Sequence, residues 1–285
     1  MLSFTVQILL IGLIAFAVSI LGNIAGFGGG VFLVPSLILL FLIEAEIAVA
    51  TVLTALFFPA LIGTIGAWRK NHVDIRFGLI FGIPSAAGTF IGALSIQKIE
   101  ESIVVILISV IAFCFGLRMI IYYFKEKHDK KNNIDSSRDE PIFSFLSRIK
   151  PIYKIKNGEL TNDISLTIVF LLGLAVGVIS GLFGISGGWI QVPIFILLFR
   201  IDPLKASGTS LFIILLKTFV GGITYIARQR IDWIILLILA VTLVLGALVG
   251  NWLKGKITGT HLSLIAALAI LLVAIFTVLS VILNW

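Results

Sequence analysis

Long apolar runs dominate the chain. Eight of them approach the roughly 20 residues that a helix needs to cross a hydrocarbon layer about 30 Å thick. Two shorter apolar runs, Val31–Ile43 and Trp189–Phe199, each follow a cluster of glycines. The pattern predicts a multi-pass membrane protein built from helices. The long runs are Leu2–Leu21, Ala48–Ala67, Phe77–Ile96, Ser102–Phe124, Ser165–Gly184, Ser207–Ala227, Trp233–Leu253 and Leu262–Leu283.

Composition and charge support this class. Of the 285 residues, 59% are hydrophobic and 12% are charged, which is too apolar for a soluble domain. The net charge of +7 does not indicate nucleic-acid binding, because residues 125–163 hold 16 of the 35 charged side chains, nine basic and seven acidic. We expect a charged cytoplasmic connector at 125–163, between transmembrane repeats at 1–124 and 164–285.

The chain repeats itself. A shift of 158 positions aligns residues 26–98 with 184–256 without a gap. Matches of glycine, proline, aspartate and threonine in register indicate two copies of one unit, since apolar matches alone mean little in a membrane protein. The pairs include Gly29 with Gly187, Gly30 with Gly188, Pro35 with Pro193, Thr51 with Thr209, Asp74 with Asp232, Gly88 with Gly246 and Gly92 with Gly250.

The relative orientation of the copies follows from the number of spans in each. Five spans per copy would invert the second copy, and four would keep the copies parallel. Cytoplasmic loops carry an excess of Lys and Arg. With a cytoplasmic connector, inverted copies place seven basic loop residues inside and three outside, whereas parallel copies divide them five and five. We therefore expect an all-α polytopic membrane protein of two inverted repeats of about five segments, with glycine-broken helices and both termini outside. Arg228 and Arg230 are exceptions, since they fall outside.

The glycine clusters predict broken helices. The first contains Gly28, Gly29 and Gly30, and the second contains Ser186, Gly187 and Gly188. A break within the membrane creates a helix start with unpaired N–H groups, which favours an anion. The alternative is that the glycines only allow close helix packing.

Lys217 is the second candidate feature. It is the eleventh residue of an apolar run that begins at Ser207, close to the predicted membrane centre. A charge at that depth costs about 2.5–3.5 kcal/mol on insertion scales, so such residues commonly face a cavity or a partner. Lys217 aligns with Pro59, so only one copy carries the charge. The alternative is a structural lysine that pairs with a carboxylate or with freed carbonyls.

Other residues complete the expected site. Thr51, Thr209, Ser210, Ser186, Gln191 and Trp189 are the polar or aromatic candidates beside the breaks, whereas Asp74 and Asp232 fit helix N-caps. The sequence contains neither a catalytic triad nor a metal-ligand motif, and Cys114 is its one cysteine. We expect no enzymatic activity, cofactor or metal.

With these motifs the chain resembles the TauE/SafE family of sulfite exporters. The resemblance rests on Gly26-Phe27-Gly28-Gly29-Gly30 with Pro35 and on Gly184-Ile185-Ser186-Gly187-Gly188 with Pro193. Further matching segments are 206–210, 73–76 and 88–92. The resemblance implies a secondary transporter in the plasma membrane for sulfite, sulfoacetate or a related anion. Val52 departs from the Ala-x-x-Thr-Ser pattern of the second copy.

The working hypothesis is an ion- or proton-coupled carrier that binds a small anion between the two breaks, with Lys217 supplying the charge. Its expected partners are the anion and the lipid bilayer, with a homodimer left open and nucleic acid excluded. Two alternatives stand beside it: a passive anion channel, and a noncatalytic scaffold whose glycines only pack helices.

Overall fold

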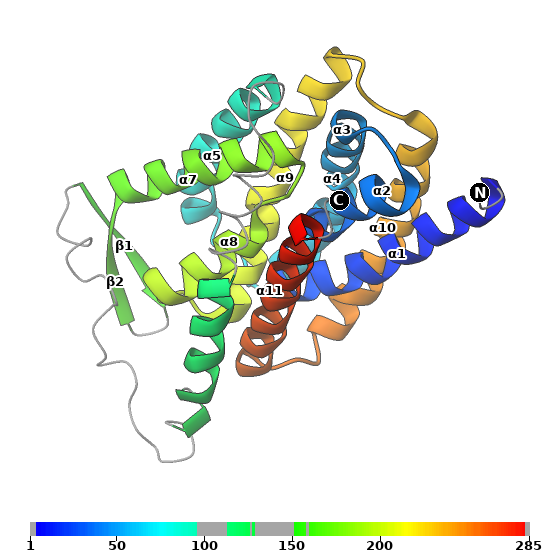
Figure 1. The fold of residues 1–285 in the computed structure, drawn as a ribbon. Coiled ribbons are helices and arrows are strands. Elements are labelled where there is room, and N and C mark those ends of the chain that lie inside the picture. The colour runs from blue at the N-terminus through cyan, green and yellow to red at the C-terminus, as the bar shows by residue number, and fades with distance from the viewer. Residues whose placement is uncertain (1–3, 96–112, 126, 129–150, 158–159, 283–285) are drawn as a thin grey trace.

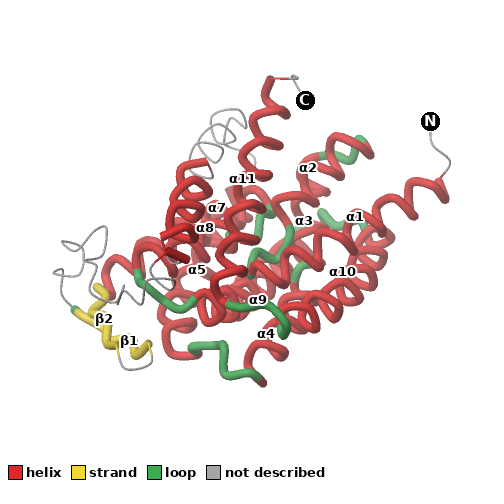
Figure 2. Tube along the Cα trace, turned by 90° about the horizontal axis from the view of Figure 1, so that it is seen from below, coloured by secondary structure: helices red, strands yellow, loops and turns green. Residues whose placement is uncertain are grey.

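The computed structural model describes residues 4–95, 113–125, 127–128, 151–157 and 160–282 (Figures 1 and 2). Within them, six helical stretches are long and apolar enough to span a membrane. These are Thr5–Ala25, Ala45–Arg69, Ile75–Ser95, Leu166–Phe183, Pro203–Ala227 and Trp233–Lys254. The chain is therefore a polytopic α-helical membrane protein, as the apolar runs predict.

The elements follow one another in an order that repeats. The first copy contains α1 (Phe4–Ala25), α2 (Gly30–Phe41), α3 (Ala45–Ala55), α4 (Phe57–Arg69) and α5 (Ile75–Ser95). The second contains α7 (Leu166–Phe183), α8 (Gly188–Pro193), a π-helical turn (Ile194–Leu198), α9 (Pro203–Ala227), α10 (Trp233–Lys254) and α11 (Gly259–Ile282). A helix over residues 113–125 precedes the second copy.

Element boundaries of the two copies coincide after the shift of 158. Helices α1 and α7 end at Ala25 and Phe183, and the next helices begin at Gly30 and Gly188. Even the non-glycine residues with a left-handed backbone form repeat pairs, Leu42 with Arg200 and Asn71 with Gln229. The local conformation is therefore repeated together with the sequence.

Glycines allow the helices of one copy to pack closely on those of the other, α5 on α7 and α10 on α1. A methyl group added at Gly173 would lie 2.7 Å from the Phe81 carbonyl oxygen, and one at Gly250 would lie 2.8 Å from the Ile20 carbonyl oxygen. Small residues permit such approach between membrane helices. The packing role of glycine therefore applies within the spans.

The predicted aspartate caps are confirmed. Asp74 Oδ1 accepts a hydrogen bond from the Phe77 N–H at 3.0 Å, and Asp232 Oδ1 accepts one from the Ile234 N–H at 2.9 Å. Each carboxylate satisfies a backbone donor that has no intrahelical partner. These bonds fix the starts of α5 and α10.

Two features differ from the simplest expectation. Strands β1 (Ile152–Asn157) and β2 (Leu160–Ser165) form an antiparallel hairpin before α7, mostly within the charged connector that the sequence predicted at 125–163. Most of the remaining connector lies outside the described residues, and so does Lys98. In addition, the span Ala45–Arg69 changes helix between Ala55 and Phe57, near Pro59, whereas its counterpart α9 is one helix. A proline removes a backbone donor, which favours such an interruption.

Candidate functional site

Both glycine clusters break their helices, as predicted. Gly29 and Gly187 immediately precede α2 and α8 and have left-handed φ angles of 95° and 67°. Residues with a Cβ rarely adopt this conformation, which explains the requirement for glycine. Neither helix start has a side-chain cap, so the first N–H groups of each depend on other acceptors.

The two breaks pack directly against each other. A methyl group at Gly30 would lie 2.7 Å from the Gly184 carbonyl oxygen, and one at Gly188 would lie 2.6 Å from the Gly26 carbonyl oxygen. The Ser186 hydroxyl donates a hydrogen bond to the Phe27 carbonyl oxygen. Gly28 completes the contact, since a methyl group there would lie 2.9 Å from Ser186 Oγ.

Lys217 reaches the second break from the middle of α9. Its side chain is fully buried, and its Nζ donates to the Ser186 carbonyl oxygen at 2.5 Å. A methyl group at Gly187 would lie 2.9 Å from the same Nζ. Within the described residues Lys217 forms no salt bridge, so its charge is compensated by one carbonyl dipole. An ammonium group has three donors, and one of them has a hydrogen-bond partner among the described residues.

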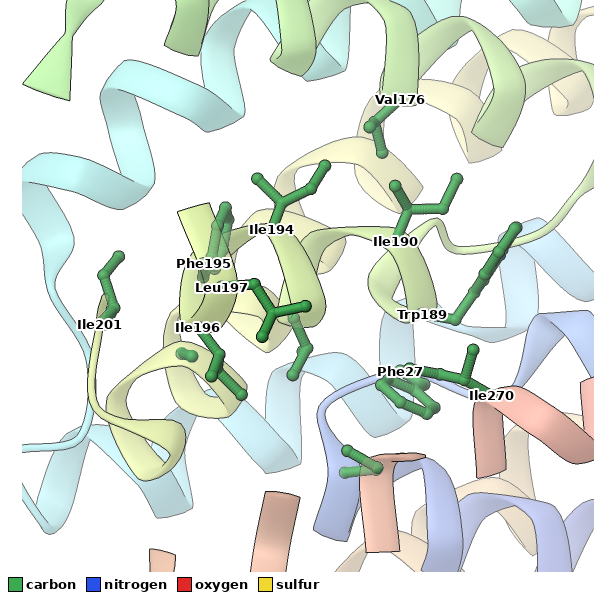
Figure 3. Close-up of a cluster of buried hydrophobic side chains, with 14 of the residues drawn as sticks. Phe27, Val176, Trp189, Ile190, Ile194, Phe195, Ile196, Leu197, Ile201 and Ile270 are labelled. Carbon is green, nitrogen blue, oxygen red and sulfur yellow. The ribbon is translucent and has the colours of Figure 1, made fainter. Parts of the chain in front are cut away.

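Two further buried donors lie on α8. Gln191 Nε2 and Trp189 Nε1 have no hydrogen-bond partner among the described residues, although both side chains are fully buried. Gln191 Oε1 contacts Ser210 Oγ at 3.2 Å, and the same hydroxyl donates to the Gly26 carbonyl oxygen at 2.8 Å. The Trp189 indole belongs to a buried apolar cluster with Phe27 (Figure 3). A buried donor without an acceptor is uncommon and calls for a ligand or another explanation.

The structure separates two predicted site residues from this cluster. Thr209 Oγ1 accepts the Asp74 N–H at 3.0 Å, and Thr51 Oγ1 accepts the Asp232 N–H at 3.1 Å. Thr209 precedes Lys217 by eight residues, about 12 Å along an α-helix. Thr209 of the second copy therefore joins the loop before α5, and Thr51 of the first copy joins the loop before α10.

The two arginines that were exceptions to the charge count share one carboxylate partner. Arg228 Nη2 and Arg230 Nε lie 3.5 Å and 3.6 Å from the carboxylate oxygens of Glu46. Arg228 Nη1 also donates to the Ala93 carbonyl oxygen at 2.6 Å. The cluster reduces the local positive charge at the end of α9.

Sequence reasoning missed one buried pair. Lys254 Nζ donates to Ser207 Oγ at 2.6 Å, and both side chains are buried. Lys254 ends an apolar run, so the sequence indicated a charge in a loop. The repeat indicates the burial of this position, because the residue that aligns with Lys254 is the apolar Ile96.

The polar atoms of α8 that lack a hydrogen-bond partner among the described residues are donors. Backbone carbonyls already have donors in Ser186, Ser210 and Lys217, whereas the unpartnered polar atoms on α8 are nitrogens. No group of three or more His, Cys, Asp or Glu side chains suited to a metal occurs among the residues that the structure describes. A surplus of buried donors favours an anionic ligand.

Spanning-length helices, two broken helices that meet in the interior and a buried lysine are features of a polytopic membrane protein. Comparisons agree, since the family model "Sulfite exporter TauE/SafE" matches residues 11–277. The chain is 30% identical over 264 residues to "Probable membrane transporter protein YunE" of Bacillus subtilis, covering 90% of this chain and 87% of that protein. It is 24% identical over 286 residues to "Probable membrane transporter protein MJ0441" of Methanocaldococcus jannaschii, covering 94% of each.

The chain belongs to the sulfite exporter TauE/SafE family. No solved structure matches it.

Proposed function

We propose that this protein is a secondary transporter of a small sulfur oxyanion or organosulfonate, such as sulfite or sulfoacetate, in the plasma membrane. Transport is coupled to an ion or proton gradient. The anion binds beside Lys217 at the second glycine break. Neither catalysis nor a cofactor is required for this activity.

The observation that carries the proposal is the buried Lys217 ammonium without a carboxylate partner. A charge inside the membrane is expensive, and a protein retains one where it faces a ligand or a partner. Lys217 Nζ is held by the Ser186 carbonyl oxygen, which directs it to the break. The unpartnered nitrogens of Gln191 and Trp189 add neutral donors on the neighbouring helix.

The contact between the two breaks supports a carrier over an open channel. Gly30 and Gly188 each approach a carbonyl oxygen of the opposite break so closely that an added methyl group would overlap it. A continuous pore needs space at this crossing, whereas a carrier closes and opens alternately. The passive channel is therefore the second candidate.

The two repeats are proposed to be inverted. Reciprocal contacts, such as Thr51 with Asp232 and Thr209 with Asp74, are those of a two-fold relation between the copies. In Figure 1, α1 enters the molecule from the side of the N-terminus and α7 from the opposite side, beside the hairpin. Spanning helices that run in opposite directions belong to inverted copies.

Cysteine labelling tests this topology. Asn71 and Gln229 occupy equivalent exposed turns of the two copies. In a Cys114→Ala background, single cysteines at these positions should react with a membrane-impermeant maleimide from opposite faces of the membrane. Reaction of both from the same face would instead require parallel copies.

Flux in proteoliposomes tests the transport activity. The purified protein should carry radiolabelled sulfite or sulfoacetate faster than empty liposomes, and an imposed pH or sodium gradient should change the accumulated amount. Sulfate and thiosulfate serve as further substrates to be compared. Saturation at turnover rates typical of carriers supports the proposal, whereas large single-channel currents in planar bilayers would favour the channel.

A further inference from the structure

A second buried lysine lies at the end of α10, away from the glycine break. Lys254 is 6% exposed and donates to Ser207 Oγ at 2.6 Å and to the Asn23 carbonyl oxygen at 3.5 Å. Within the described residues it forms no salt bridge. Asn23 Oδ1, in the same cluster, has no hydrogen-bond partner there. A buried ammonium held only by uncharged oxygens retains most of its unbalanced charge.

Ser210 lies between this cluster and the Lys217 site along α9. At about 100° per residue, Ser210 lies about 60° from Ser207 and about 20° from Lys217 around the α9 axis, so Ser207 and Lys217 are about 80° apart. Ser207 Oγ donates to the Ile24 carbonyl oxygen at 3.1 Å and Ser210 Oγ to that of Gly26 at 2.8 Å. Ser207 and Ser210 therefore form a polar line along the first glycine break, and Lys217 lies about 15 Å from Ser207 along α9, beyond the buried Ile214.

The first copy lacks this line. The residues that align with Ser207, Ser210 and Lys254 are Val49, Val52 and Ile96. Both valines are buried. Beyond Lys217, α9 continues with Gly221, which packs against the Leu53 side chain. Further along, the buried Thr224 donates to the Val220 carbonyl oxygen of its own helix, so hydroxyl contacts with the first glycine break occur only on the Ser207 side of Lys217.

Further positive charge surrounds that end. Burial lowers the pKa of His72 in the loop between α4 and α5, and the nearby charges of Lys254, Lys70 and Lys205 also lower it, against the opposing effect of Asp202. Lys70 Nζ lies 3.5 Å from the Asn251 carbonyl oxygen, on the last turn of the same α10. A concentration of like charge raises the local concentration of anions and the rate at which they arrive.

We propose that Lys254, with Ser207, forms a second anion subsite, through which the transported anion passes between the aqueous phase and Lys217. This inference rests on the proposed function. Lys254 and its basic neighbours belong to the face that the charge count assigns to the cytoplasm. The subsite gives that face an entrance that the opposite half of the molecule does not duplicate.

Sided kinetics test the subsite. Uptake of radiolabelled sulfite is measured in right-side-out and inside-out membrane vesicles, so that each face in turn meets the anion. For Lys254→Met the KM should rise about tenfold at the Lys254 face, the effect of losing one hydrogen bond to a charged group. The KM at the opposite face should stay as in the wild type. Lys254→Arg, which keeps the charge, should restore most of the affinity.

Lys256→Met is the matched control. This lysine is two residues away, is exposed and lies over the Trp252 ring at 3.5 Å, so its loss removes the same charge without touching the subsite. Its KM should match the wild type at both faces. If Lys254→Met does not insert, Ser207→Ala replaces it, and a smaller rise at the same face is expected.

The outcomes separate the two proposals. If the wild type carries neither sulfite nor sulfoacetate in either orientation, the proposed function fails and the subsite fails with it. If the wild type carries sulfite but Lys254→Met keeps both KM values, only the subsite is overturned. An equal rise at both faces, accompanied by a lower melting temperature, would also overturn it, because that is the result of a structural lysine.

Discussion

Replacing one glycine at each break separates backbone strain from the position of Lys217. Gly187 and Gly29 are equivalent residues of the two copies, and both precede a half-helix with a left-handed φ. An added methyl group would lie 2.9 Å from Val176 Cγ1 at Gly187 and 2.7 Å from Val18 Cγ1 at Gly29. The two sites differ in that only the Gly187 methyl group would also meet Lys217 Nζ, at 2.9 Å.

The structure sets the expected magnitudes. A left-handed alanine costs about 1–2 kcal/mol, and overlap with a packed side chain adds about 1–3 kcal/mol. Gly187→Ala and Gly29→Ala should therefore both lower stability by about 2–5 kcal/mol. At Gly187 the ammonium is the mobile end of its side chain, so it moves away from the break. Loss of its contact with the anion should raise the KM for sulfite about tenfold in Gly187→Ala alone.

The assay compares thermal melting of the purified variants in detergent with sulfite flux per folded molecule in proteoliposomes. Melting temperatures should fall in both variants, whereas the KM should rise only in Gly187→Ala. An equal rise of the KM in Gly29→Ala would contradict a specific role of Lys217, because strain at either break would then be sufficient.

Three further outcomes follow from particular contacts. Thr51→Val and Thr209→Val should each lower stability by about 1–3 kcal/mol, because each leaves an aspartate backbone N–H without its acceptor. The KM for sulfite should not change in either variant. Unequal melting temperatures of the two variants would argue against reciprocal roles. Because folding lowers the pKa of His72 below its ordinary value of 6.5, the neutral imidazole contributes stability above pH 6.5, and this contribution is lost as the pH falls. His72→Gln should therefore reduce the decline in melting temperature between about pH 7.5 and 5.5. An unchanged decline would exclude His72 as its source. Glu46→Gln should lower stability by only about 0.2–1 kcal/mol, since its arginine partners are partly exposed, and a larger loss in the melting curve would contradict this.

Local features could be predicted from the sequence. The apolar runs give the spans because the bilayer sets their length. The glycine clusters give the breaks, and Asp74 and Asp232 give the starts of α5 and α10, because backbone strain and capping act over a few residues. The hairpin was not predicted, because the charge of residues 125–163 indicated only a solvated connector.

Tertiary contacts could not be predicted. Thr51 and Thr209 are hydroxyls on apolar helices, and only packing of the two copies shows that each accepts an N–H from the other. Lys254 follows an apolar run, where a lysine ordinarily reaches water, and its burial depends on Ser207 and Asn23 from other helices. The depth of Lys217 was visible in the sequence, but its contact with the Ser186 carbonyl oxygen was not.

Sulfite flux by Lys217→Met tests the proposed anion site most directly. Methionine keeps the approximate volume and removes a charge whose insertion costs about 2.5–3.5 kcal/mol, while the Ser186 carbonyl oxygen loses a hydrogen bond worth about 1–3 kcal/mol. The variant should therefore insert and melt close to the wild type. Its flux at sulfite concentrations below the KM should fall about 10- to 150-fold, because the anion loses its charged donor. Wild-type flux from correctly inserted Lys217→Met would contradict an anion site at the second glycine break.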